Sequence, residues 1–380
     1  MANTVLTDSS NVQKWATDFA KEYIRESGFA DLMGTKDGAI IRVRNELVSS
    51  AGTIVHVPHI ARLRAAGVTG SATLKGNEEA LSNYSFALRT TFHRKAVNIL
   101  QSDQIKTEIQ LLDAAKAALK DYFAEKLRTD IIDSLQGINI VGVANADGTP
   151  GEDSFKTYAV ATAPEKNAWL VANQDRVLIG SKKANYSGTL STDLAKITAA
   201  NDKLTPAFVS LMKRTAKLSG ALAGKNRIMP YKVEDGRELY VLCVDSNGFR
   251  DLRNDANMMA ANRDARVRGE SNIIFADGDL MWDGVVIKEI PEIPTLGAVG
   301  NATGNGSGGP ATVGTAFLLG RGAITMAYSQ QLTPVTQKED YGFQNGVGLS
   351  ECRSLAGMLT SFNGVMYGVL RAFHSSEADA

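Results

Sequence analysis

The stretch Asp103–Leu135, DQIKTEIQLLDAAKAALKDYFAEKLRTDIIDSL, carries the clearest structural signal in this sequence. Its apolar residues recur in steps of three, four or seven, which places them along one face of an α-helix and does not fit the alternation of a strand. The stripe comprises Ile105, Ile109, Leu112, Leu119, Phe123, Leu127, Ile131 and Leu135. We therefore predict one continuous amphipathic helix over residues 103–135.

The residues at both ends of this stretch suit a helix. Ser102 or Asp103 can cap the amino end, and Gly137 stands where a left-handed carboxyl cap is expected. No Gly or Pro interrupts the stretch, and its alanines favour helix. Such a helix is roughly 50 Å long, more than a compact domain requires. Two interpretations remain open, a helix lying across a sheet and a structural spine.

Composition excludes several protein classes. The chain has 380 residues, enough for two domains, and 44% of them are apolar, which excludes wholesale disorder. The 41 basic and 41 acidic residues balance, so a basic surface for gripping nucleic acid is missing at the level of the whole chain. Cys243 and Cys352 are too few for a disulfide scaffold, and both are expected to be reduced and buried. Without a secretion signal or a run of about 18 apolar residues, we expect a soluble protein made in a reducing cytoplasm.

Residues 1–50 are predicted to form an arm with short helices. Its apolar side chains, Trp15 and Phe19 among them, have too little chain around them to be covered locally. We expect the arm to pack on another part of the protein or on a neighbouring molecule. Its last part, Ile40–Leu47, alternates as a strand does.

A long polar excursion separates two predicted strands, Thr53–Ile60 and Tyr84–Leu100. About 20 residues without a core pattern are unusual between two strands of a compact domain. We predict a two-stranded loop that projects outward, with a disordered surface loop as the alternative.

The remaining chain mixes helices and strands without a repeating unit. The patterns predict helices over Pro206–Leu218 and Ala323–Gln330 and a buried strand over Glu238–Val244. Strand-like pieces return near the end, including Val365–Phe373. Strands drawn from distant parts of the sequence indicate the α+β class.

Two glycine-rich segments resemble nucleotide-binding motifs, but the residues around them do not fit those motifs. Gly304, Gly306 and Gly309 match the spacing of a dinucleotide loop, but Pro310 follows them, and no helix start is indicated. The segment Gly220–Lys225 resembles a phosphate loop but is one residue short and lacks the Ser or Thr that holds magnesium. We predict a flexible loop and a turn, respectively.

The sequence supports metal and catalytic sites no better than it supports nucleotide binding. His56 and His59 stand three apart in a predicted strand, so they point to opposite faces. Asp277, Asp279 and Asp283 resemble calcium ligands, but the spacing departs from the known loop, and a turn is the better interpretation. Together with His93 and His374, the four histidines do not define a triad. We expect no catalytic residue, no metal and no cofactor, and we keep a metal-dependent α+β enzyme at the Asp277/Asp279/Asp283 turn as a minor hypothesis.

Several longer pieces, taken in order, resemble the major capsid proteins of tailed phages with the Hong Kong 97-type fold, and more narrowly the coliphage N-four-type capsid family. The pieces are RAAGVTGSATLKGNEEALSNY before TTFHRKAVNI, YVLCVDSNGFRDLRND, DGDLMWDGVVIKEIPEIP, AFLLGRGAITMAY and EDYGFQNGVGLSECRSLAGMLTSFNGVMYGVL. Each is degenerate alone, and their order and spacing across nearly the whole chain carry the resemblance.

The resemblance implies a division of the chain into functional parts. Residues 1–50 would be an arm that wraps a neighbour, and residues 51–97 an extended loop lying over the next subunit. Residues 98–204 would form a peripheral domain with its spine helix at 103–135 and a probable insertion at 138–204. Residues 205–335 would form an axial domain, and residues 336–380 would return to the peripheral domain.

The same resemblance implies a shell protein that assembles with itself into hexamers and pentamers enclosing double-stranded phage DNA. Contacts between subunits are expected at Trp15, Phe19, Arg62, Arg64, Lys75, Glu78 and Glu79. Portal, scaffolding and decoration proteins are further possible partners, the DNA is enclosed without sequence-specific binding, and no membrane is involved. The protein is expected in the virion after assembly in the bacterial cytoplasm. An encapsulin-like compartment shell, with protein cargo inside, is the alternative.

Overall fold

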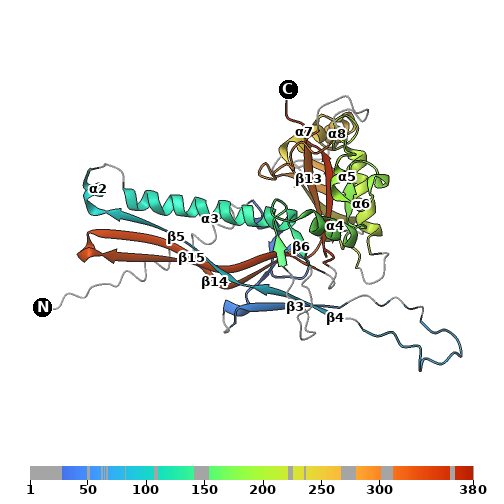
Figure 1. Ribbon diagram of the computed structural model, residues 1–380, viewed down its shortest axis with the longest axis horizontal. Coiled ribbons are helices and arrows are strands. Elements are labelled where there is room, and N and C mark those ends of the chain that lie inside the picture. Colours follow the sequence, from blue (N-terminus) through green and yellow to red (C-terminus); the bar gives the residue numbers. More distant parts are fainter. Residues whose placement is uncertain are drawn as a thin grey trace.

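The computed structural model describes residues 28–48, 52–60, 63, 65, 67–81, 83–106, 110–140, 154–220, 226–234, 237–266, 280–300, 311–359 and 364–379. The chain forms an elongated α+β molecule, as expected from the sequence. A long sheet with a helix along it leads to a compact body at one end (Figure 1).

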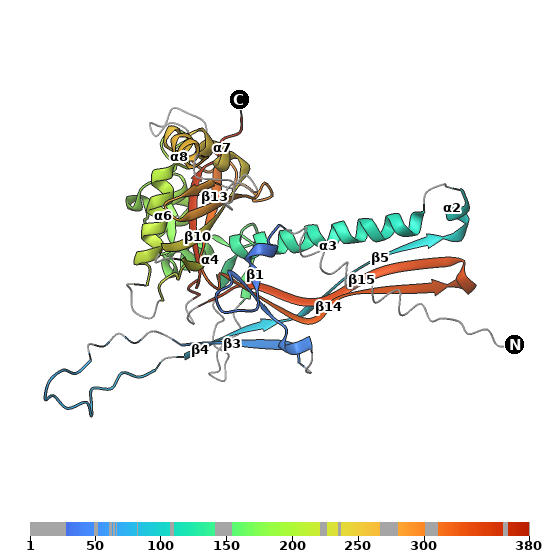
Figure 2. The ribbon, with the colours of Figure 1, turned by 180° about the vertical axis from the view of Figure 1, so that it is seen from behind.

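The long sheet has five strands in the order β1-β2-β14-β15-β5. Its strands are β1 (Met33–Gly34), β2 (Ile41–Arg44), β5 (Thr91–Leu100), β14 (Ile324–Glu339) and β15 (Gln344–Gly357). β14 and β15 form a long antiparallel hairpin whose tip, η5 (Asp340–Gly342), lies far from the compact body (Figures 1 and 2). Short 3-10 turns, η1 (Ala30–Leu32) and η2 (Glu46–Val48), flank β1 and β2.

The predicted helix over Ala323–Gln330 is wrong, because these residues begin β14. Ile324–Tyr328 are buried, with β2 on one side and β15 on the other. Periodicity alone cannot tell a short strand that is buried on both faces from a buried segment of helix. The two flanking strands, which come from distant parts of the chain, supply the backbone hydrogen bonds that decide for a strand.

The long helix is shorter than predicted. A separate helix, α2 (Gln101–Lys106), precedes α3 (Leu111–Gln136), whose 26 residues span roughly 39 Å. Ile105 is 80% exposed, so it does not belong to the buried stripe. The amino end of α3 is at Gln110, without a side-chain cap, and not at Ser102 or Asp103.

The carboxyl end of α3 also differs from the prediction. Gly137 has φ −65° and ψ 163°, which is extended backbone and not a left-handed cap. Its glycine is required by crowding, since a Cβ there would lie 1.9 Å from the Phe155 ring. The Arg371 guanidinium donates to the Leu135 carbonyl and, at 2.9 Å, to that of Gly137, which satisfies acceptors that the helix end leaves free.

The central part of the predicted stripe is confirmed. Leu119, Phe123, Leu127, Ile131 and Leu135 are buried, and α3 packs mainly on β15 and β5. The core around α3 continues into both sheets, through Met326 in the long one and Phe317 in the other. The helix therefore joins the long sheet to the compact body.

The compact body is built on a seven-stranded sheet in the order β11-β12-β10-β13-β16-β8, with β9 pairing β10. The strands are β8 (Val177–Ile179), β9 (Lys232–Glu234), β10 (Arg237–Val244), β11 (Leu280–Trp282), β12 (Val285–Glu289), β13 (Val313–Leu319) and β16 (Val369–Ser375). Its helices are α4 (Ala163–Ala172), α5 (Leu190–Leu194), α6 (Pro206–Leu218), α7 (Ser246–Asn254) and α8 (Ala256–Arg266), with the turn η3 (Lys183–Asn185). Helix α6 has the predicted bounds, begins at the Thr205 cap with Pro206 at its first position, and packs in a second core with β10 and β12.

The two sheets divide the chain differently from the expected segments. The expected boundary at residue 335 falls inside β14, and within the expected return over residues 336–380 the end of β14 and all of β15 lie in the long sheet. β16 instead pairs with β13 and β8, and β8 comes from the expected insertion 138–204. All seven residues of β16 are buried, in keeping with its place between β13 and β8.

Two smaller sheets and the cysteines complete the description. β3 (Ile54–Ile60) pairs with β4 (Asn83–Arg89), and β6 (Ile138–Ile140) with β7 (Ser154–Lys156). Cys243 and Cys352 are buried thiols, as predicted. Across the described ranges, none of the helices combines the length and the apolar character that a membrane span requires.

Candidate assembly surfaces

The projecting loop predicted between two strands is present. β3 and β4 pair in register from Ile54↔Arg89 to Ile60↔Asn83, and the chain between them runs away from the long sheet, in the direction opposite to the β14–β15 tip (Figures 1 and 2). Side chains of residues 70–81 are exposed. The described residues 70–81 of the loop therefore form no core with one another or with the rest of the described chain.

The base of this hairpin is firmly held. Val55, Val57, Phe86 and Leu88 are buried on one face and pack with residues of β14 and the segment after β15, namely Ala327, Met358, Leu359 and Tyr367. Alternation along both strands places these four side chains on the same face. A rigid base thus carries an exposed extension.

Exposed apolar side chains mark the loop as a contact surface. Ile60, Leu63, Leu74 and Leu81 are each more than half exposed. Large apolar side chains gathered on a projecting segment are typical of surfaces that another molecule covers. Sequence reasoning missed them, although leucines inside an otherwise polar excursion were a usable signal.

The charged residues expected to make contacts divide into two groups. Lys75, Glu78 and Glu79 are exposed on the loop, and both glutamates also bind its own backbone. The Glu79 carboxylate accepts from the Ala65 amide at 2.7 Å, which ties the two sides of the loop together. Trp15, Phe19, Arg62 and Arg64 lie outside the described residues.

The face of the long sheet opposite α3 carries a shallow groove of about 750 Å³. Gly346 and Gly348 of β15 line it, between Ala96 on β5 and Val335 on β14. Phe92, further along β5 on the same face, is also largely exposed. Among the described residues, nothing covers Phe92, Ala96 and Val335 on this face, and all three are exposed.

The tip of the β14–β15 hairpin presents an aromatic ring. Asp340 and Tyr341 have φ of 48° and 51°, a left-handed conformation that side chains other than glycine and asparagine rarely adopt. Tyr341 is fully exposed, and Phe343 after the tip and Ile105 of α2 are exposed as well. The Gln101 amide donates to the Phe343 carbonyl at 2.8 Å, which joins the start of α2 to the residue that follows the tip.

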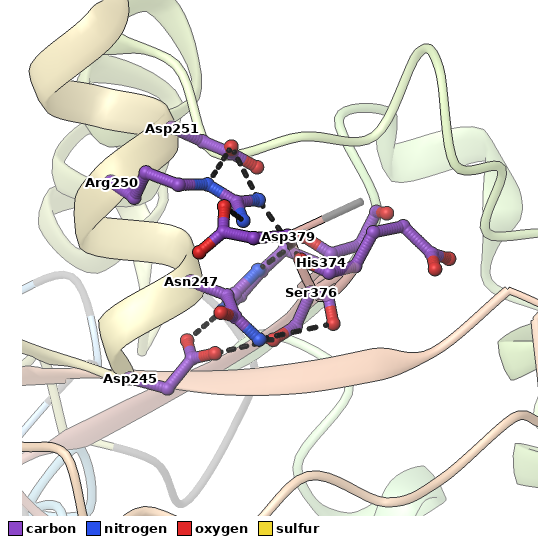
Figure 3. Close-up of polar contacts among 9 residues, drawn as sticks. Asp245, Asn247, Arg250, Asp251, His374, Ser376 and Asp379 are labelled. Atoms are coloured by element: carbon purple, nitrogen blue, oxygen red, sulfur yellow. Dashed lines mark hydrogen bonds and ion pairs between the residues drawn. The ribbon is translucent and has the colours of Figure 1, made fainter.

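A serine, a histidine and an aspartate meet in the compact body but do not form a catalytic triad. His374 Nε2 lies 3.1 Å from Asp245 Oδ1, and the Ser376 hydroxyl donates to the other oxygen of the same carboxylate (Figure 3). In a triad the histidine stands between serine and aspartate, whereas here the aspartate stands between the other two. All three side chains are buried, so no substrate could reach them.

The described residues do not support a metal site at the turn with Asp277, Asp279 and Asp283. Asp277 and Asp279 lie outside the described residues, and Asp283 is in a turn with φ 48°, its carboxylate 3.1 Å from the Lys213 ammonium. In the part of the chain that the structure describes, three potential ligands of the His, Cys, Asp or Glu type never come together.

Comparison with known proteins points in one direction. A family model described as phage capsid protein matches residues 3–357. The major capsid protein of Pseudomonas phage KPP25 is 24% identical over 366 residues, covering 93% of this chain and 90% of the relative.

Solved structures agree with this match. The capsid subunit of cyanophage Pam1 is 32% identical, with a TM-score of 0.80 and full coverage of both chains. The capsid of Ralstonia phage GP4 shares the fold, with a TM-score of 0.69 at 19% identity, covering 93% of this chain and 92% of the other. Both are structures of phage capsids.

Proposed function

This chain belongs to the phage capsid protein family, and from that premise we propose a role in the capsid shell for each part of the chain. As a major capsid protein it associates with copies of itself to form the capsid of a phage particle, and it is a component of the virion. Its role is structural, and we assign no catalytic step to it.

The loop between β3 and β4 is proposed to lie over a neighbouring subunit. Its support is the exposure of Leu63, Leu74 and Leu81 on a segment without a core of its own. Burying an exposed leucine contributes about 1.5–3 kcal/mol, and the contact repeats at every copy in the shell. Lys75, Glu78 and Glu79 would add polar contacts at the rim of this surface, together with Arg62 and Arg64.

The two sheets are proposed to be the peripheral and axial domains. The long sheet with α3 would be the peripheral domain, and the seven-stranded sheet with α4–α8 the axial domain around which hexamers and pentamers close. The arm, residues 1–50, would wrap a neighbour through Trp15 and Phe19.

Further partners follow from the same role. With 41 basic and 41 acidic residues, the chain suits an enclosure for DNA that binds no particular sequence. Portal, scaffolding and decoration proteins are proposed partners, and assembly is proposed to take place in the cytoplasm of the host bacterium.

Electron microscopy of purified Leu74→Asp tests the loop. We expect this variant to keep the melting temperature of unassembled wild-type protein and to lose shells, because the charge prevents burial of position 74. Thr73→Asp is the matched control, since it adds the same charge at an exposed neighbour without removing an apolar contact. Shells formed by Leu74→Asp as readily as by wild type would refute the role of the loop, and a wild-type chain that stays monomeric at all concentrations would refute the whole proposal.

A further inference from the structure

The last described residues of the chain are fastened to the compact body. Beyond β16, the Ser376 amide donates to the Thr312 carbonyl at 2.9 Å, and the Thr312 amide donates to the Glu377 carboxylate at 2.9 Å. Arg250 of α7 donates to the Glu377 carbonyl at 2.9 Å and pairs with the Asp379 carboxylate (Figure 3). The segment Ser375–Asp379 is therefore bound to both β13 and α7.

The His374 ring occupies a slot built from two glycines. A Cβ on Gly248, in α7, or on Gly314, in β13, would lie 2.8 Å from the His374 Cε1 atom. Larger residues at either position would displace the ring. Sheet and helix thus leave space for one buried imidazole, at the point where the segment leaves β16.

One ring nitrogen of His374 is hydrogen-bonded, and the other lies beside a buried carboxylate. Nδ1 lies 3.0 Å from the Ser375 carbonyl oxygen, and Nε2 lies 3.1 Å from Asp245 Oδ1, which is ion-pair distance without the alignment of a hydrogen bond. A protonated imidazole supplies the counter-charge of the buried carboxylate, and a neutral imidazole does not. The arrangement therefore favours the protonated histidine.

The charges around the ring favour the same state. Burial by itself lowers the pKa of His374, but the contacts with Asp245, the Ser375 carbonyl and the more distant Asp251 outweigh it and raise that pKa above the usual value. Burial likewise opposes ionisation of Asp245, yet its bonds with His374 and Ser376 hold its pKa below the usual value. The Arg250 guanidinium is paired with Asp251 and Asp379, and residues 202 and 203 meet Ser375 through their backbone.

We infer that Ser375–Asp379 is a latch on α7 that His374 holds closed while its imidazole is protonated. Loss of the proton leaves the buried Asp245 carboxylate without the positive charge 3.1 Å from it, which is costly in a buried site. The segment and α7 then separate more often. This inference concerns an internal fastening and does not depend on the contacts proposed for the loop.

The direction of the pH effect follows from proton linkage. The closed latch binds a proton more tightly than the open segment, whose histidine has the ordinary pKa of 6.5. The stabilisation is complete below that value and is lost as the pH rises through the raised pKa of the closed state. Between the two values the opening constant rises by up to about tenfold per pH unit.

Hydrogen-exchange mass spectrometry on the full-length wild-type protein tests the latch. Exchange of a peptide covering 372–379 would be compared with one covering 241–244 in β10, from about pH 6 to about pH 10. The reference peptide, from the same sheet, corrects for the intrinsic pH dependence of exchange. We expect the ratio of the two opening constants to rise with pH, and a flat ratio would overturn the inference.

Two variants identify the titrating group. In His374→Gln the ratio should already be high at about pH 6 and should not change further, because glutamine carries no proton to lose. His93→Gln removes a histidine of the long sheet and should keep the wild-type profile. If the ratio of opening constants still rises with pH in His374→Gln as in the wild type, His374 is not the titrating group. If that variant does not fold, the pH dependence of the ratio in the wild-type protein still tests the latch.

Discussion

The Arg353 Nη2 atom of β15 lies 2.6 Å from the Asp130 Oδ2 atom of α3, in the interface between the long sheet and its helix. Arg353 also bonds Glu351 at 2.6 Å, and Asp130 bonds Lys126 at 2.7 Å. The four side chains form an alternating chain of charges, with Arg353 and Glu351 fully buried. These bonds fix how the helix is rotated on the sheet, which apolar packing alone leaves less specified.

Asp130→Asn should destabilise the unassembled protein by on the order of 2 kcal/mol, because it removes one of the two carboxylates that pair with the buried Arg353 guanidinium, while Glu351 keeps the other contact. Chemical denaturation measures this loss. The control is Asp113→Asn on the same helix, where the pair with Lys116 is largely exposed and contributes less than about 1 kcal/mol. Equal losses in the two variants would mean that burial of the Arg353–Asp130 pair does not matter.

Leu119→Asp should prevent folding before it affects assembly, since Leu119 is 2% exposed in the core beneath α3. An unpaired carboxylate in this core costs several kcal/mol. Ile105→Asp is the control, because the sequence pattern placed Ile105 in the same stripe while the structure exposes it. Circular dichroism should report an unfolded Leu119→Asp and a folded Ile105→Asp, and soluble capsomers of Leu119→Asp would contradict the packing described.

Gly137→Ala should cost about 1–3 kcal/mol, because its Cβ would collide with the Phe155 ring. Removing the ring in Gly137→Ala/Phe155→Ala should recover part of the loss relative to Phe155→Ala alone. Gly67→Ala, whose Cβ would meet no atom within 4 Å, is the matched control. Thermal unfolding compares the variants, and an unchanged midpoint for Gly137→Ala would show that the crowding is absent.

Tyr341→Gly should stabilise the unassembled chain by about 1 kcal/mol, because glycine adopts the left-handed conformation without strain and the exposed ring contributes no packing. Phe343→Gly, at φ −74°, should instead destabilise it, since glycine has more freedom to lose there. Denaturation midpoints that move the same way in both variants would contradict this account of the tip.

Much of the fold could be predicted from local pattern. The stripe from Leu119 to Leu135 has a helical period, so its burial in a core follows from the sequence. The strands of the β3–β4 hairpin, the polar excursion between them and the Pro206–Leu218 helix with its cap and proline carry equally local signals. The order of longer pieces along the chain carried the resemblance to phage capsid proteins.

The candidate surfaces were only partly predictable. Lys75, Glu78 and Glu79 were correctly expected in the projecting loop, but the exposed leucines beside them were overlooked. His374 was noted as one of four histidines and given no role, because its partner Asp245 is 129 residues away in the sequence. A pair of residues so far apart leaves no local pattern in the sequence, so the contact between His374 and Asp245 can be recognised only from the tertiary structure.

The sequence by itself determined the α+β class, the buried face of α3 and the presence of a projecting hairpin, because each depends on periodicity or composition within one segment. Only the tertiary structure decided that residues 324–330 form a strand, that β16 joins the seven-stranded sheet, and that α3 begins at Leu111. Each of these depends on hydrogen bonds and apolar contacts with segments far away in the chain. The charge pairs Arg353–Asp130 and His374–Asp245 belong to the same class, since two opposite charges attract strongly only after the fold has brought them together away from water.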